Sequence, residues 1–154
     1  MNVFYLSSDP VLSARYHCDK HVVKMILEYA QLMCTAHHLT GSGHAGMYRV
    51  THQNHPSAVW VRKSVSHYMY VFRMWEQLLD EFSIRYGKQH KTGTLYDDLS
   101  AAPSLPMTEF QAPPQCMPEE YKRDDAVTAY RVYYKHGKAD ILQYKHNRPS
   151  WLGE

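Results

Sequence analysis

The stretch from Asp9 to His38 constrains the fold most, because it carries two helical periods on separate faces. Apolar residues recur at spacings of four and three, the pattern of a helix face that packs into a core. Polar residues follow the same spacing along another face. The apolar series is Val22, Ile26, Tyr29, Met33 and Ala36, and the polar series is His17, His21, Lys24, Glu28, Gln31 and Thr35. The sequence therefore predicts an amphipathic helix with ionisable groups gathered on one face.

Helix start and stop signals predict three main helices. The first spans 9–38, opens at Asp9-Pro10, is expected to bend near His17–Cys18, and ends before a glycine-rich turn at 40–43. The second opens at His55-Pro56 and carries an aromatic-rich apolar stripe as far as the glycine at 87. The third follows an aspartate pair at 124–125, either of which can cap it.

Two segments are expected to lie outside the helices. Residues 2–7 are β-branched and aromatic, and a helix cap follows them at once, so we expect a short extended segment across the core. Five prolines fall between 103 and 118, which predicts a long irregular loop over 95–125. With no internal repeat and no sign of a second domain, the sequence predicts one compact all-α domain over residues 1–154.

Composition and charge indicate the cellular location of the protein and the class of partner that it binds. The N-terminus lacks a signal peptide pattern, no apolar run reaches the length of a membrane span, and three cysteines have no paired spacing. We therefore expect no membrane partner and a cytoplasmic, intracellular location. Lys and Arg outnumber Asp and Glu ten to six over 1–91, whereas the ratio is seven to nine over 92–154. The first part is thus mildly basic, as suits a polyanionic partner.

The polar face of the first helix has three interpretations that the residues alone leave open. The first interpretation is an ordinary solvent-exposed helix face, on which ion pairs such as Lys24 and Glu28 are common. Histidines are rare on such faces, however, and this chain has 11. His17 and His21 have the spacing of two metal ligands, as in a metal-dependent hydrolase, and Glu28, His52 or His55 could supply a third ligand. The third interpretation is an enzyme site in which the Glu28 carboxylate stabilises an oxocarbenium-like sugar and the nearby cations hold the flanking phosphates. No H-E-x-x-H, phosphate loop or nucleophile elbow is present.

The chain resembles a known enzyme family at several positions. Asp19-x-His21-Val22-Val23 followed by Glu28 is similar to the D-x-H-L-[LM]…E signature of phage-type pyrimidine-dimer DNA glycosylases, the endonuclease V-like enzymes. A histidine at the opening of a long aromatic helix matches His52 or His55. The stretch Arg148-Pro149-Ser150-Trp151 resembles the family's Arg-Pro-[ST]-Trp near the C-terminus. Chain length and helical layout also match.

The resemblance implies a metal-free, cofactor-free enzyme that binds double-stranded DNA as a monomer, kinks it and expels a base. In this family the N-terminal α-amine attacks C1′ of the damaged nucleotide, which gives a Schiff base and then strand cleavage. The resemblance makes Glu28 the catalytic carboxylate, Met1 the source of the amine and His21 a residue that orients the site. An α-amine suits this role because its pKa of about 7.7–8.0 leaves much of it neutral near pH 7.

Two departures from the family change the expected details. Residue 2 is Asn, whose side chain is too large for efficient removal of the initiator methionine. Met1 is therefore expected to be retained and to carry the N-terminal α-amine. Leu27 and Gln31 stand where the family has arginines, so phosphate contacts are expected from other cations. The expected DNA-binding residues are His17, Lys20, Lys24, His52, Asn54, His55, Arg62, Lys63 and Arg148. A different modified base, hydrolysis without lyase activity, and a non-enzymatic nucleic-acid-binding module remain open. Because the resemblance is to phage enzymes, we expect the protein to act inside an infected bacterial cell.

Overall fold

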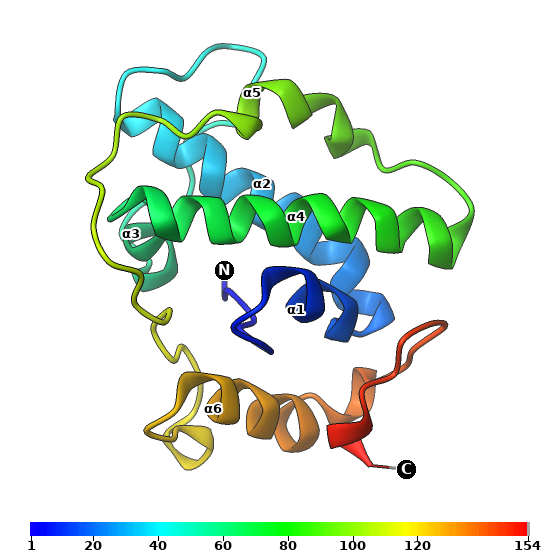
Figure 1. Cartoon of the computed structure of the whole chain (residues 1–154). Coiled ribbons are helices and arrows are strands. Elements are labelled where there is room, and N and C mark those ends of the chain that lie inside the picture. The colour runs from blue at the N-terminus through cyan, green and yellow to red at the C-terminus, as the bar shows by residue number, and fades with distance from the viewer. Residues whose placement is uncertain (154) are drawn as a thin grey trace.

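The computed structural model describes residues 1–153, which form helices and connecting segments without any β-strand. Two long helices, α2 (Asp19–Leu39) and α4 (Val65–Tyr86), cross at the centre of the molecule, as Figure 1 shows. The shorter helices are α1 (Pro10–Tyr16), α3 (Pro56–Val61), α5 (Tyr96–Ser100) and α6 (Ala126–Val132). Single 3-10 or π-helical turns cover Lys91–Leu95, Glu119–Tyr121, Tyr133–Gly137, Ala139–Ile141 and Ser150–Leu152. The predicted all-α class is confirmed.

The core lies where α1 and α2 both pack against α4. All five residues of the predicted apolar series on α2 are at most 1% exposed. Trp75 of α4 is completely buried, and its indole N–H donates to the backbone oxygen of Ile26 at 3.0 Å. The apolar stripe therefore does what its period predicts, and it fixes which face of α2 is left for polar groups.

The first expected helix is two helices, because the bend expected near His17–Cys18 is a full break. His17 has extended backbone angles, and Cys18 starts α2 as its N-cap residue. The backbone oxygens freed at the break are bound by the Arg85 guanidinium, which donates to the oxygen of His17 at 2.7 Å and to that of Arg15 at 3.0 Å. A buried arginine from α4 thus compensates the lost helical hydrogen bonds.

The second expected helix is also divided, so the prediction of three main helices is too simple. The chain leaves the helix at Arg62–Ser64, and Ser64 caps α4 by accepting from the N–H of Ser66. The Ser64 hydroxyl also donates to the backbone oxygen of Thr108. Residues 101–118 contain no helix, whereas 96–100, which were expected in the irregular loop, form α5. At the start of α6, Asp125 is the cap, as its position predicts.

The N-terminal segment runs through the interior and places the chain start beside α2. Val3, Phe4, Tyr5 and Leu6 are each at most 6% exposed. Arg131 of α6 donates from Nε to the backbone oxygen of Leu6 at 2.9 Å. In Figure 1 this segment, in dark blue, lies between the α2–α4 pair and α6. Within residues 1–153, none of the helices combines the length and the apolar character that crossing a membrane requires.

Candidate active site

The N-terminal amine meets the carboxylate of α2 that the sequence singles out. The nitrogen of Met1 lies 3.5 Å from Oε1 of Glu28, and the Glu28 side chain is only 16% exposed. On its other side, Nζ of Lys24 lies 3.6 Å from Oε2. One carboxylate therefore stands between an α-amine and an ε-ammonium group in a partly desolvated setting. Coulombic attraction is stronger there than in open water.

One oxygen of Glu28 has spare bonding capacity. Oε2 is buried and has no hydrogen-bond partner in the described chain, because the Lys24 nitrogen lies just beyond hydrogen-bond distance. A buried carboxylate oxygen without a donor is costly, so an unpaired one in a folded protein calls for an explanation. The Lys24 ammonium group, 3.6 Å away, is the charge that compensates this oxygen.

Three contacts hold the amine at Glu28. The Met1 side chain is 5% exposed and packs against the core. The side-chain amide of Asn2 donates to the backbone oxygen of Cys116 at 2.8 Å. The N–H of Phe4 donates to the Tyr29 hydroxyl at 3.1 Å, inside the core. Each contact joins the start of the chain to a distant residue, so the position of the amine depends on the whole fold.

His17 is a structural residue, and the expected DNA contact for it is wrong. Its side chain is fully buried, with Nδ1 2.6 Å from the Ser13 oxygen and Nε2 2.8 Å from the Tyr29 hydroxyl. Burial lowers its pKa to about 3, so the ring is neutral at pH 7. We assign the ring proton to Nδ1, which donates to Ser13, while Nε2 accepts from Tyr29. Neither nitrogen is left to bind a metal ion.

His21 lies at the boundary between the core and the surface. It is 3% exposed, and its Nδ1 lies 2.7 Å from the Tyr134 hydroxyl. The Phe4 ring covers one face at a centroid distance of 4.3 Å. Burial, followed by the charge of His17 and the nearby lysines, lowers the pKa of His21 to about 2. The imidazole is therefore a fixed neutral group.

The 52–63 segment brings one histidine toward the amine. His55 caps α3 by accepting the N–H of Ser57 on Nδ1, and its pKa is lowered by burial and then by the positive charge of the N-terminus. His52 and Asn54 are exposed on the preceding turn, where His52 has a φ of 49°. The response of the His55 pKa to the N-terminal charge places this histidine on the side of the chain start.

The remaining predicted DNA contacts lie in different settings. Arg62 ends α3 half-buried, and its Nη1 is buried without a hydrogen-bond partner in the described chain. Lys63 next to it is exposed. Arg148 is exposed in the C-terminal tail and donates to the backbone oxygen of Gly153, and no contact joins it to Glu28 or Met1 within residues 1–153. The structure therefore does not bring Arg148 into the Met1–Glu28 site.

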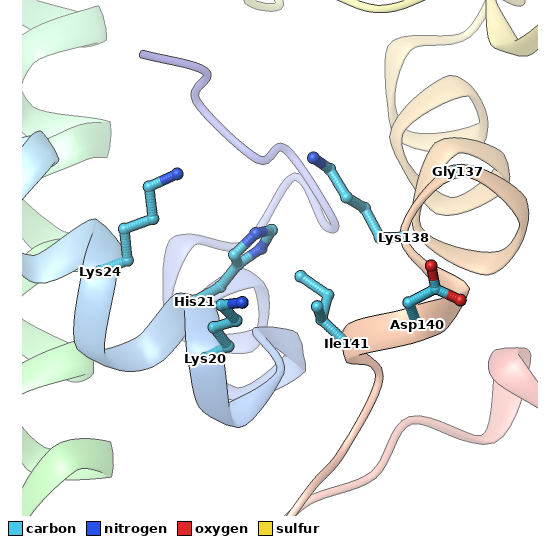
Figure 2. A pocket seen from close by; sticks show the side chains of 7 residues that line it. All are labelled: Lys20, His21, Lys24, Gly137, Lys138, Asp140 and Ile141. Atoms are coloured by element: carbon cyan, nitrogen blue, oxygen red, sulfur yellow. The ribbon is translucent and has the colours of Figure 1, made fainter.

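A pocket beside Glu28 gathers three lysines. Lys20 and Lys24 project from successive turns of α2, His21 lies between them, and Lys138 faces them from the turn after α6 (Figure 2). Lys20 and Lys24 belong to the predicted set. Lys138 and Tyr134 were not predicted, because only the fold brings these two residues to α2. Tyr29 belongs to α2 and was predicted on its buried face, but its contact with the N-terminal segment was not. No local spacing in the sequence could have revealed Lys138, Tyr134 or that contact.

Two findings bear on the identity of the site. Among residues 1–153, no three His, Cys, Asp or Glu side chains are arranged to hold a metal ion. No family model, curated protein or solved structure matches the chain. The geometry around Met1, Glu28 and the lysine pocket therefore carries the functional argument.

Proposed function

We propose that the protein is a DNA glycosylase with abasic-site lyase activity, acting on a pyrimidine dimer or another damaged or modified base in double-stranded DNA. The observation that carries the proposal is the 3.5 Å approach of the Met1 nitrogen to Glu28. A free amine beside a carboxylate is the pair that imine-forming base release needs. The sequence resemblance to the pyrimidine-dimer glycosylases implies the same roles, with Glu28 as the carboxylate and Met1 as the source of the amine.

The proposed reaction begins with the neutral amine of Met1. Its nitrogen forms a bond to C1′ while the glycosidic bond breaks, and the base leaves with the electron pair and takes up a proton. Glu28 accepts the proton that the attacking nitrogen loses, and its negative charge stabilises the positive charge that develops at C1′ and the ring oxygen. Ring opening, with a proton going to O4′, then gives the protonated imine.

Strand cleavage follows from the imine. Loss of a proton from C2′ lets the C3′–O bond break, and the 3′-phosphate leaves with that electron pair. Water then hydrolyses the imine and restores the amine. The position of Glu28 Oε1, 3.5 Å from the Met1 nitrogen, supports a direct role for the carboxylate, because it lies where the attacking amine loses its proton and where charge develops at C1′.

The surface around Met1 supports a polyanionic partner. Lys20 and Lys24 are exposed on α2, the helix that carries Glu28, and Lys63 is exposed just after α3. In the second part of the chain, by contrast, acidic residues outnumber basic ones. Cations that neutralise phosphates supply much of the affinity for DNA. We propose that one copy of the chain forms a complete site, because Met1 and Glu28 meet within one copy.

A nicking experiment tests the proposal. The protein is incubated with ultraviolet-irradiated and unirradiated supercoiled plasmid, and nicked circles are counted. We expect nicking only of irradiated plasmid, reduced about 10²–10³-fold by Glu28→Gln, because that change removes the charge and keeps the shape. Glu109→Gln, at an exposed glutamate in the 101–118 segment, is the matched control and should nick normally.

Two results would overturn the assignment. Nicking that survives in Glu28→Gln removes the carboxylate from the reaction. Salt-dependent binding to DNA without turnover on irradiated plasmid, or on substrates with other modified bases, would make the protein a nucleic-acid-binding module instead.

A further inference from the structure

The lysine pocket is built from two elements that the fold brings together. Its lining comprises Lys20, His21 and Lys24 of α2, together with Gly137, Lys138, Asp140 and Ile141 from the turns after α6. The cavity has a volume of about 290 Å³ and opens to solvent. Figure 2 shows the three lysines around the imidazole, with Lys138 on the side opposite α2.

The charge balance of the pocket is positive. Three ammonium groups face a single carboxylate, Asp140. Within residues 1–153, no ion pair joins Lys20 or Lys138 to an acidic side chain, and the one contact of Lys24 is with Glu28. Lys138 rests instead on the Tyr133 ring, 5.1 Å from its centroid. The lysines thus have charge left for a ligand.

The neutral His21 ring offers the pocket an N–H donor. The Tyr134 hydroxyl can donate to Nδ1 of His21 at 2.7 Å or to the sulfur of Cys18 at 3.8 Å. We assign the donation to His21, because sulfur is the weaker acceptor and the distance to it is longer. The proton of the neutral ring then lies on Nε2, the nitrogen that Tyr134 does not bind. Burial and the three lysines, which all lower the pKa of His21, keep the ring from taking a second proton.

The lining suits a phosphate rather than a base. Phosphate is recognised by converging cations and N–H donors, and lysine acts on it as a compact point charge. A base requires an aromatic platform for stacking. Apart from His21, whose ring face is covered by Phe4, the pocket has no aromatic lining, and Ile141 is its one large apolar residue.

We propose that this pocket binds one backbone phosphate of the DNA strand, adjacent to the nucleotide that reacts at Glu28. The inference rests on the proposed function, because it takes the strand at Glu28 as the ligand. Lys24 borders the pocket and also contacts Glu28, one helical turn or about 6 Å further along α2. A phosphate bound by Lys20, Lys24 and Lys138 thereby positions the sugar of the reacting nucleotide next to the Glu28 carboxylate. It carries no base specificity.

The test measures how binding depends on salt, with a duplex containing a tetrahydrofuran abasic analogue that cannot form an imine. Each phosphate near the analogue is replaced in turn by an uncharged methylphosphonate. For wild type, each phosphate that contacts a cation contributes about 0.9 to the slope of log affinity against log salt concentration. Lys138→Gln should lower that slope by about 1. Lys135→Gln, an exposed lysine on the same turn that does not line the pocket, is the matched control and should not change it.

The decisive result is a coupling between Lys138 and one phosphate. At that position, the methylphosphonate and Lys138→Gln together should lower the slope by about 1, whereas at every other contacted position the two losses should add. Additive losses at all positions would overturn the proposal, as would an equal loss with Lys135→Gln. Binding of inorganic phosphate in the pocket without any coupling to the duplex would also overturn it, in favour of a free anion.

This test and the nicking test can fail separately. The abasic analogue undergoes no reaction, so coupling between Lys138 and one phosphate would stand even if irradiated plasmid were not nicked. In the opposite case, normal nicking with no coupling would remove the phosphate pocket and leave the roles of Met1 and Glu28 intact.

Discussion

Tyr29→Phe tests whether the buried hydrogen bonds of α2 position the N-terminal amine. The Tyr29 hydroxyl accepts from the Phe4 N–H at 3.1 Å and donates to His17 Nε2 at 2.8 Å, and the side chain is fully buried. Phenylalanine keeps the ring and removes only the oxygen. The segment that ends at Met1 then loses its hydrogen bond to α2.

The cost follows from the two groups left without a partner. A buried donor or acceptor that loses its partner costs about 1–3 kcal/mol, so the loss at two groups should lower the free energy of unfolding of Tyr29→Phe by about 2–6 kcal/mol. Because the Phe4 N–H is three residues from the amine, we also expect the Met1 nitrogen to lose its fixed place at Glu28. A displacement of about 1 Å at a reacting group can reduce the rate about 10²-fold.

Tyr68→Phe is the matched control. The Tyr68 hydroxyl is equally buried, donates to the Leu99 oxygen at 2.7 Å and lies 2.9 Å from Nε2 of His37, so the same substitution removes the same kind of contacts. These contacts join α2 and α4 to α5 and do not involve the N-terminal segment. Urea unfolding gives the stability of both variants, and the rate of borohydride trapping on an abasic duplex gives the state of the amine.

The expected outcome separates stability from positioning. Both variants should be less stable, but only Tyr29→Phe should trap slowly under conditions where both remain folded. Equal trapping rates in folded Tyr29→Phe and Tyr68→Phe would refute the reasoning that Tyr29 positions the amine. An unchanged stability of Tyr29→Phe would refute the hydrogen bonds themselves.

Three further predictions use other contacts. His17 has a pKa of about 3 when folded and about 6.5 when unfolded, so its contribution to stability is full above pH 6.5 and falls by about 1.4 kcal/mol per unit as pH drops toward 3. His21, with a pKa lowered to about 2, adds a similar loss, so the pH slope of stability should be about 1.4 kcal/mol per unit shallower in His17→Gln than in wild type; urea unfolding at several pH values measures this. Arg85→Met leaves the buried Glu81 carboxylate unpaired and should cost about 3–5 kcal/mol in urea unfolding. Asn2→Ser should permit Met1 removal, seen by intact mass, and slow trapping at least tenfold, because the amine recedes by about 3.8 Å.

The sequence predicts the helical class and the buried face of α2 because both follow from local spacing. Val22, Ile26 and Met33 recur at the helical period, and all three are completely buried. The break at His17 is only partly predictable. The sequence predicts a bend near His17 but not a full break. The break is stabilised by Arg85, which is 68 residues away along the chain and donates to the His17 oxygen.

The candidate site also has features that local spacing predicts and features that depend on long-range packing. The spacing from His21 to Glu28 is a local feature, and it led to a carboxylate that the structure finds beside Met1. The polar series that contains them was not uniformly exposed, since His17 and Thr35 are completely buried. A period assigns a face to each residue, but it does not say that the N-terminal segment will cover part of the polar face. Lys138 enters the pocket through the same long-range packing.

Reduction of the proposed imine tests the central claim most directly. Wild-type protein is incubated with a duplex that contains an abasic site, borohydride is added, and the cross-linked peptide is mapped by mass spectrometry. The account predicts one adduct on the α-amine of Met1, absent when that amine is blocked by acetylation. An adduct on Lys24, which also contacts Glu28, or no adduct at all would contradict it.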